Sequence, residues 1–450
     1  MRSYIKTLLL TQTGKDTSVV FIGTLINIII GGLFFIFAPR ILGPQNYGLF
    51  SVVIATGLMA VNLANFGIDT GILRFIPSEK TLAFMLGMRV NPRSEEERTE
   101  AERIGESIKK DREYSEKILK LAFKSYVVIG IAVLILGIVI SNPLAKVLGA
   151  PQISNLLKIA FSATVFTLLS NFFVAALQSK KEFVKASLIN IASNTSRLAI
   201  LGIASYFVVV DLYFLTILFF FIAIVSVLLG AFFTPLDFLK TKDEKIHFKT
   251  FFGYNFWVAA SLAISSIPYD NYVLLKFAGP VSTGIFAAPF KILSTTYQFA
   301  GSFSRVLAPR FSSFDTNLKA IVFSKKASLF VGVIFLGLFL SSVFAQYFVQ
   351  IFLGEQYQQS VNVFRILAIG MAFFFAGTIP MALILYYFGK SKIAFYTTIW
   401  HYFIYVLLLL SLASTYKEIG ASVAFSLSEA INFATLFIYI VYKFNQKSVA

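Results

Sequence analysis

The chain reads VVIGIAVLILGIVI at Val127–Ile140 and TILFFFIAIVSVLLGAFF at Thr216–Phe233. Neither stretch contains a charge, and apolar runs of this kind last about twenty residues, the length of an α-helix that crosses about 30 Å of hydrocarbon. A transmembrane β-barrel would instead show strands of about ten residues with alternating apolar and polar positions. Because lipid satisfies no backbone hydrogen bonds, these unbroken runs predict membrane-spanning helices.

The rest of the chain has the same character. Of its 450 residues, 57% are hydrophobic and only 14% are charged, whereas soluble domains carry about 25% charged residues. Twelve segments are long enough to span a bilayer. We place them near residues 19–38, 47–68, 121–141, 154–177, 186–206, 212–235, 250–275, 281–306, 327–351, 361–387, 393–413 and 419–442. The sequence therefore predicts an all-α integral membrane protein with about twelve transmembrane helices.

Lys and Arg residues determine the predicted orientation. One set of alternate connections holds 18 of them and the opposite set holds 4. The rich set comprises residues 1–18, 178–186, 236–250, 309–326, 388–394 and 443–450. Because cytoplasmic loops are enriched in Lys and Arg, we expect a multi-pass protein of the cell membrane with both termini in the cytoplasm.

The one sizeable loop, residues 78–120, lies on the predicted cytoplasmic side. Ser94 and Glu97 form a capping box, and Glu113 with Lys117 supplies an i,i+4 pair. These features predict a solvated helix that continues into the third span, and a binding site for a regulatory partner is the alternative.

Composition excludes several classes of function. The chain has no cysteine and two histidines, so structural disulfides, thiolate chemistry and a dedicated metal site are not expected. It lacks a G-x-x-x-x-G-K-[ST] loop, which argues against an ATP-driven pump. The net charge of +17 suits anionic lipid headgroups or an anionic substrate better than nucleic acid. Short outer loops disfavour an enzyme, and no cofactor is expected.

An internal duplication divides the chain. Leu42-Gly43-Pro44-x-x-x-Gly48-x-Phe50 recurs as Ala278-Gly279-Pro280-x-x-x-Gly284-x-Phe286, and Leu148-Gly149 resembles Leu353-Gly354. Each half holds an even number of predicted spans, so the two repeats have the same orientation in the membrane. We expect a six-helix lobe at 1–235, with a helical insertion at 78–120, and a second six-helix lobe at 236–450. Such parallel repeats are related by an axis along the membrane normal, and substrate binds between them.

The repeated segments also resemble a known family. The first half carries Pro39-Arg40-Ile41-Leu42-Gly43-Pro44-Gln45-Asn46-Tyr47-Gly48-Leu49-Phe50-Ser51, and the second carries Asp270, Gly279-Pro280, Gly284-Ile285-Phe286-Ala287-Ala288 and Lys291. These residues resemble polysaccharide (O-antigen type) flippases of the multidrug/oligosaccharidyl-lipid/polysaccharide exporter superfamily. The resemblance spans nearly the whole chain, although the charged stretch 89–117 departs from it.

The resemblance implies a V-shaped transporter that works by alternating access. Its substrate would be an oligosaccharide on a polyprenyl or dolichyl phosphate or pyrophosphate, moved from the cytoplasmic to the outer leaflet. Related lipid II flippases usually have fourteen spans, so a count of twelve favours the polysaccharide branch. A lipid II-type flippase and a multidrug cation antiporter of the same superfamily remain the alternatives.

Charges inside spans are costly, by about 2.5–3.5 kcal/mol on insertion scales, and they mark candidate sites. The predicted eighth span carries a polar stripe on one helical face. Its members are Lys291, Ser294, Thr295, Gln298, Ser302 and Arg305. A cationic stripe suits a lipid phosphate. Alternatively, Lys291 pairs with Asp270 and Arg305 reaches the interface with its charged end.

Two further cations are candidates for substrate binding. Arg197 lies on a polar face of the fifth span, where interhelical hydrogen bonding is the alternative role. Arg40 lies at the outer end of the first span, where it could equally anchor the helix at the interface. A cation exporter would need acidic lobes, so the interior cations favour an anionic substrate.

The acidic candidates are Asp69, Asp270 and Glu429, which could bind Na⁺ or H⁺ and couple transport to a gradient, or act in gating. In the repeat Asp69 aligns with Arg305, so an ion pair between the lobes could close the cytoplasmic side. His401, in the eleventh span, is expected to be a structural, hydrogen-bonded residue.

Overall fold

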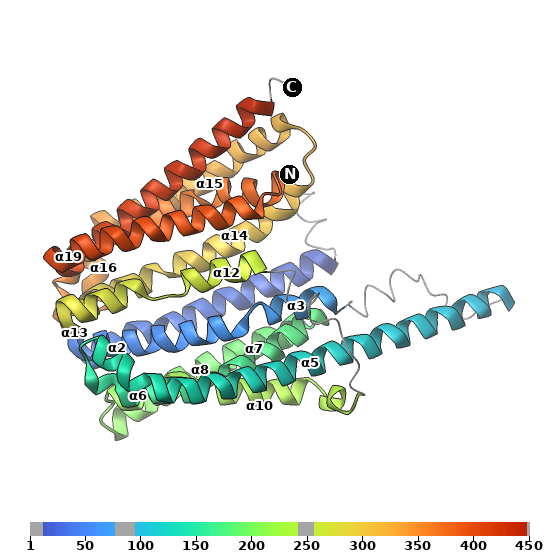
Figure 1. The fold of residues 1–450 in the computed structure, drawn as a ribbon, viewed down its shortest axis with the longest axis horizontal. Helices are drawn as coiled ribbons and strands as arrows, with labels where there is room; N and C mark the ends of the chain where they lie inside the picture. The colour runs from blue at the N-terminus through green and yellow to red at the C-terminus, as the bar shows by residue number, and fades with distance from the viewer. Residues whose placement is uncertain (1–11, 77–94, 242–255, 448–450) are drawn as a thin grey trace.

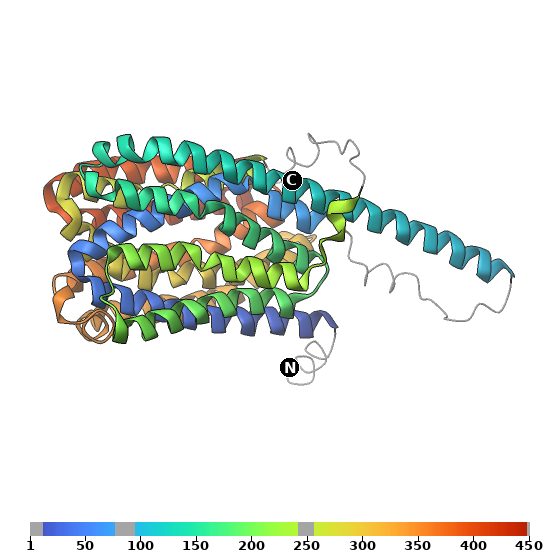
Figure 2. The same ribbon diagram turned by 90° about the horizontal axis from the view of Figure 1, so that it is seen from below.

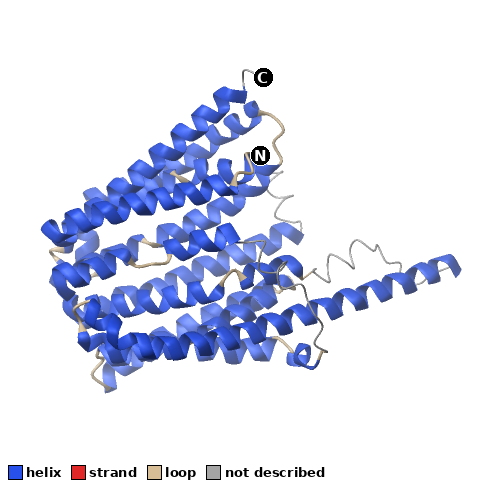
Figure 3. Cartoon of the chain, in the orientation of Figure 1, coloured by secondary structure: helices blue, strands red, loops and turns tan. Residues whose placement is uncertain are grey.

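The computed structural model describes residues 12–76, 95–241 and 256–447, and within these ranges the regular structure is helical (Figures 1 and 3). The first half contains α2 (Gln12–Asn65), α3 (Ile68–Phe75), α5 (Glu95–Val147), α6 (Ser154–Ser162), α7 (Thr164–Ser179), α8 (Phe183–Phe207), α9 (Leu212–Phe221) and α10 (Ala223–Phe233). The second half contains α12 (Phe256–Ser265), α13 (Tyr269–Leu293), α14 (Thr295–Ser312), α15 (Asn317–Val343), α16 (Ala345–Phe352), α17 (Ser360–Ala376), α18 (Thr378–Ala382), a π-helical turn (Leu383–Tyr387) and α19 (Ser391–Lys447).

Three of these helices contain a sharp turn at which the chain reverses direction. The turns lie at Gly43 in α2 (φ 67°, ψ 170°), at Gly279 in α13 (φ 82°, ψ 178°) and at Lys417 in α19 (φ 49°, ψ −130°). All three lie at one end of the bundle, which we call the turn end. The opposite end, where α19 finishes at Lys447, is the terminal end (Figure 1).

Within the described ranges, eight helical segments are long and apolar enough to cross a membrane. Three of them, of 43, 53 and 56 residues, contain the turns at Gly43, Gly279 and Lys417 and therefore each supply two legs. α8, with 25 residues, is not among the eight because polar residues such as Asn194 and Arg197 interrupt it. The predicted all-helical membrane fold is confirmed, and the exact number of twelve spans stays a prediction.

The two Gly-Pro turns, which the repeat predicts to be equivalent, have the same backbone conformation. Gly43 and Gly279 share the same left-handed conformation, which glycine adopts without the steric cost of a Cβ. The next repeated pair behaves alike, since Gly149 has φ 72° and Gly354 has φ 88°.

The two halves meet through reciprocal glycine contacts near these turns. A Cβ at Gly48 would lie 1.9 Å from the carbonyl oxygen of Pro280, and one at Gly284 would lie 1.8 Å from that of Pro44. Only glycine allows backbones to approach so closely. Because each half presents the same residue to the same partner, the contact has the self-complementary form of a two-fold interface.

Among the residues that the structure describes, the hydrophobic core has three parts. One cluster is formed by residues between Val61 and Phe238, and another by residues between Ala300 and Ile440. The largest takes residues from both halves. Figure 1 shows α15 and α19 diverging from the first-half helices toward the terminal end. This V-shaped arrangement supports the division into lobes 1–235 and 236–450, which we retain as a proposal.

Two predicted boundaries can be compared with the helices observed. α5 runs unbroken from Glu95 into the third span, and Glu113 pairs with Lys117 at 3.2 Å, which confirms a continuous helix there (Figure 2). Residues 78–94 of the predicted insertion lie outside the described ranges. The ninth span, predicted at 327–351, starts inside α15, which already begins at Asn317, where Thr316 caps it. The lysines that the prediction placed in a loop before residue 327 lie on this helix. Their long stems can pack there while their charges reach the interface.

Candidate functional site

Lys291 lies on the second leg of α13, and its side chain reaches across to the first half. Its Nζ is 4.3 Å from the centroid of the Phe35 ring in α2. Among the residues that the structure describes, no carboxylate lies within 4.0 Å of this ammonium and no acceptor takes a hydrogen bond from it. The alternative pairing with Asp270 is not formed, because the Asp270 carboxylate instead accepts from the backbone N–H of Asn271 at 2.9 Å.

Arg197 lies opposite, on α8 of the first half. It donates from Nη1 to Asn194 at 3.0 Å and from Nη2 to the carbonyl of Phe219 at 3.3 Å. Asn194 in turn donates to Asn27 of α2 at 2.6 Å, so the predicted polar face of this helix does form interhelical hydrogen bonds. The guanidinium carbon also lies 4.6 Å from the Phe219 ring centroid and 5.5 Å from that of Phe34. Its buried Nε has no acceptor within the described part of the chain.

The two cations contact one aromatic cluster. Phe34 and Phe35 are 5.3 Å apart between ring centroids, and Phe219 is 5.9 Å from each. The negative face of an aromatic ring attracts a cation without neutralising it. We call Arg197, Lys291 and these three rings the basic interlobe site. Both charges of this site are positive, and the rings leave hydrogen-bond donors of both side chains without acceptors among the described residues. Such a site is suited to an anionic ligand.

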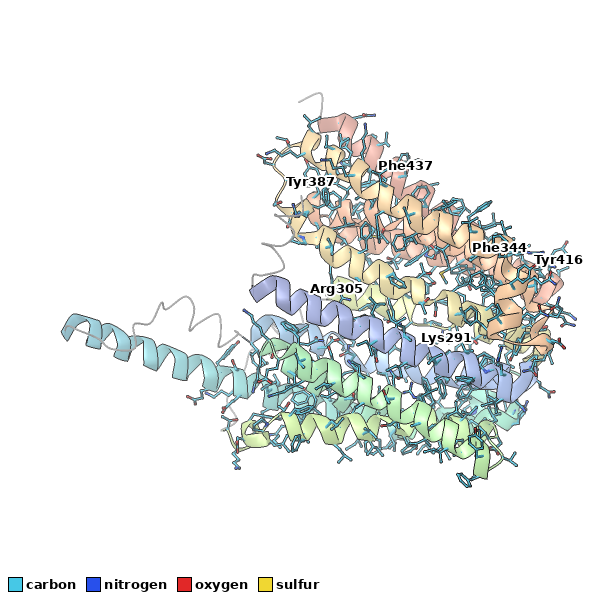
Figure 4. The ribbon with its side chains drawn as sticks, turned by 180° about the vertical axis from the view of Figure 1, so that it is seen from behind. Lys291, Arg305, Phe344, Tyr387, Tyr416 and Phe437 are labelled. Carbon is cyan, nitrogen blue, oxygen red and sulfur yellow. The ribbon has the colours of Figure 1, made fainter. Side chains whose placement is uncertain are left out.

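The other residues of the predicted stripe differ in their hydrogen bonds and in their exposure. Ser294 and Thr295 donate to backbone carbonyls three residues earlier, at 2.7 and 2.9 Å, and Ser294 separates α13 from α14. Gln298 and Arg305 are both exposed. Figure 4 places Lys291 and Arg305 on the side that faces α2, with Arg305 nearer the terminal end. The open polar groups of the stripe are therefore Lys291, Gln298 and Arg305.

Arg40 binds the second half instead of lying free. Its Nε donates to the carbonyl of Phe352 at 3.0 Å, and Nη2 donates to that of Ile351. These carbonyls end α16, where a cation is favoured. In return Gln356 donates to the carbonyl of Arg40 at 2.9 Å. We call these contacts the turn-end latch. Its members are Pro39, Arg40, Ile351, Phe352, Gln356 and Tyr357.

The second half buries two carboxyl groups that sequence analysis did not associate. Glu429 is 3% exposed, and its Oε1 lies 3.6 Å from His401 Nε2, while its Oε2 has no partner within the described ranges. Asp270 is 7% exposed. Three tyrosines lie within electrostatic range of both carboxyl groups, namely Tyr297, Tyr402 and Tyr405. His401 is thus a structural neighbour of Glu429, and the acidic groups lie within one lobe.

Asp69 and Arg305 do not form the predicted pair between the lobes. Asp69 is in the first turn of α3, where the helix dipole favours a carboxylate. Arg305 contacts Ser302 at 3.4 Å and has no ion-pair partner among the residues described. In this conformation the terminal end is not closed by that pair.

Sequence reasoning missed the aromatic half of the basic interlobe site. Phe34, Phe35 and Phe219 lie in apolar runs with no polar periodicity. Their spacing in the sequence is that of ordinary core residues. No local pattern in the sequence distinguishes them from those core residues.

Comparisons with known proteins identify both sequence and fold relatives. The family described as "Polysaccharide biosynthesis protein" matches residues 13–86 and 106–315, and the unmatched residues between them overlap the charged stretch 89–117. No curated protein sequence matches the chain.

Solved structures of the MOP superfamily and of a lipid flippase share the fold. An inward-facing multidrug resistance MATE family transporter of that superfamily is 14% identical, with a TM-score of 0.71 over 96% of this chain and 100% of the other. The lipid II flippase MurJ, in an inward closed conformation, is 15% identical, with a TM-score of 0.68 over 96% of this chain and 90% of the other.

Proposed function

The chain belongs to the polysaccharide biosynthesis protein family, and we propose that it is a flippase for lipid-linked oligosaccharides. The substrate would carry a polyprenyl or dolichyl phosphate or pyrophosphate and would move from the cytoplasmic to the outer leaflet of the cell membrane. The two lobes would alternate access to a site between them, without a catalytic step.

One observation carries this proposal: the basic interlobe site joins an unpaired cation from each half. Lys291 and the buried Nε of Arg197 both retain free donors, and burying donors without acceptors is costly. A lipid phosphate offers several anionic oxygens, so it would satisfy both cations at once. Because the cations come from different lobes, binding would also link the lobes through the substrate.

The surrounding geometry supports a path to this site from the terminal end. Gln298 and Arg305 are exposed there, and Arg305 is roughly 21 Å further along the chain than Lys291 at 1.5 Å per residue. The turn end is closed by the Gly48 and Gly284 contacts and by the latch. If the terminal end is cytoplasmic, as the Lys and Arg distribution predicts, a phosphate from the inner leaflet would meet Arg305 before Lys291.

The buried carboxyl groups support coupling to an ion gradient as part of this proposal. Glu429 has an open Oε2 in a site with His401, so it could take up H⁺ or bind Na⁺. We expect Glu429→Gln to abolish the stimulation of flipping by an imposed Na⁺ or H⁺ gradient while leaving substrate binding intact. Unchanged gradient dependence in this variant would contradict a coupling role.

The same carboxyl groups favour a multidrug cation antiporter as the second candidate. Reconstituted liposomes distinguish the two. One set carries a fluorescent lipid-linked oligosaccharide in the inner leaflet, and the other carries a cationic dye. A flippase moves the lipid and leaves the dye in place, whereas dye export without lipid movement would establish the antiporter. Comparing the oligosaccharide substrate with lipid II in the same liposomes addresses the lipid II-type alternative.

A further inference from the structure

A groove in the second half lies away from the basic interlobe site. It has a volume of about 560 Å³ and lies between α15, residues 376–383 and the second leg of α19. Its lining is mainly apolar, with Val331, Ile379 and Phe437 among its walls, and the Phe437 side chain is 53% exposed. None of its lining residues belongs to α2 or α13, the helices whose side chains meet at Lys291.

Irregular helix geometry accounts for this groove. The chain leaves α17 at Ala376, passes through the short α18, and enters a π-helical turn at Leu383–Tyr387. Pro380 lies within this stretch and cannot donate a backbone hydrogen bond. Helices distorted by proline and π turns do not pack as evenly as straight ones. Tyr387 donates to Asn317 at 2.6 Å, which fixes this segment against the start of α15.

Lys325 is the charged side chain of the groove. Ser324 and Ser328 donate to carbonyls on their own helix at 2.8 and 2.7 Å, so their hydroxyls need no ligand. Lys325 is exposed and has no ion-pair partner among the described residues. It lies about 12 Å along α15 from its start at the terminal end, near the expected edge of the hydrocarbon. The groove is therefore apolar along its length and cationic at the end nearest the membrane surface.

We propose that the groove binds an anionic phospholipid of the surrounding leaflet. An acyl chain lies between α15 and α19, and the phosphate accepts from the Lys325 ammonium. A surface with this little polar lining does not hold ordered water, and hydrocarbon surrounds it in the bilayer. Charge complementarity at Lys325 selects a lipid with net negative charge over a zwitterionic one. The prenyl chain of the transported substrate is a less suitable occupant, because the groove shares no wall with the lobe interface.

Native mass spectrometry of the full-length protein tests this assignment. Protein reconstituted in vesicles of equal phosphatidylglycerol and phosphatidylcholine is extracted, and retained lipids are counted. Wild type should retain phosphatidylglycerol preferentially. Lys325→Gln should lower that preference about fivefold, and Ser328→Phe, which fills the mouth of the groove, should lower retention of both lipids. Lys326→Gln is the matched control, because this neighbour is also exposed but does not line the groove.

The proposal fails if Lys325→Gln and Lys326→Gln lose phosphatidylglycerol equally, since the preference would then reflect general surface charge. It also fails if Ser328→Phe retains the full complement of lipid. A polyprenyl phosphate added to the vesicles should not displace phosphatidylglycerol from wild type. Displacement that Ser328→Phe abolishes would assign the groove to the substrate's own chain and overturn the proposal.

Discussion

Aromatic rings hold the two cations of the basic interlobe site where a carboxylate would otherwise be expected. Phe35 contacts Lys291, and Phe219 lies under Arg197. A carboxylate at either place would lower the charge available to a ligand. A ring stabilises the cation by about 0.5–2 kcal/mol and leaves its hydrogen-bond donors open. The chemistry of the proposed site therefore depends on phenylalanines as much as on Lys291 and Arg197.

Phe35 provides a test at the residue scale. Phe35→Leu keeps an apolar side chain but removes the ring face, so affinity for a soluble short-chain polyprenyl phosphate should fall between about twofold and thirtyfold. Phe35→Tyr should bind nearly as wild type does. Phe37→Leu is the control, because Phe37 is exposed on the same helix and contacts no cation in the described structure. Equal loss in the Phe35→Leu and Phe37→Leu variants, measured by isothermal titration calorimetry, would exclude the ring contact.

Pairs of helices connect the lobes at the turn end. α2 and α13 approach backbone to backbone at Gly48 and Gly284, and Arg40 caps α16 across the same boundary. In the described part of the chain the latch has no counterpart in the other half, since Lys276, the repeat equivalent of Arg40, lies over its own neighbour Phe277, with its Nζ 5.9 Å from the ring centroid. A closed turn end thus rests on one symmetric contact and one asymmetric contact.

The glycine contact predicts a strong steric effect. Gly48→Ala places a methyl group 1.9 Å from the Pro280 carbonyl oxygen, and overpacking costs typically about 1–3 kcal/mol. The melting temperature in detergent should fall. Gly32→Ala, also in α2 but with nothing within 4 Å of its Cβ position, should keep or raise it, because alanine favours helix. A Gly48→Ala protein as stable as Gly32→Ala would contradict the close approach.

The latch predicts a change in accessibility. The chain contains no cysteine, so Ser51→Cys, placed where Ser51 meets Asn271 across the lobes, reports opening at the turn end. Arg40→Gln should speed its labelling by a membrane-impermeant maleimide several-fold. Lys276→Gln, which removes a cation from the equivalent place, should not. If both variants label at the rate of the Ser51→Cys parent, the latch does not hold the turn end closed.

For the whole molecule, local patterns predicted most of the fold. Unbroken apolar runs identified helices, and the Gly43 and Gly279 repeats identified equivalent turns, because both signals are local in sequence. The contacts between elements that are far apart in the chain could not be predicted from these patterns. No local pattern shows that Arg40 is bound by α16, that Asp270 leaves Lys291 unpaired, or that Phe35 supplies a ring. The helical turns of α15 before residue 327 were not predicted, because lysines on a helix and lysines in a loop have the same composition.

Reporter fusions test the predicted orientation in the membrane. Because loops rich in Lys and Arg lie in the cytoplasm, reporter fusions after Lys240 and after Ala450 should both give cytoplasmic signals. An external signal from either fusion would contradict this predicted topology.

The most direct test of the central claim is the rate at which Lys291 variants flip a lipid-linked oligosaccharide in liposomes. Removing one charge-assisted contact costs about 1.5–3 kcal/mol, so Lys291→Ala should flip on the order of tenfold or more slowly. Lys291→Arg should keep part of the activity. Lys158→Ala, which removes a half-buried cation bonded to Asn155 at the turn end, should match wild type. Near-normal flipping by well-folded Lys291→Ala would contradict a phosphate site between the lobes.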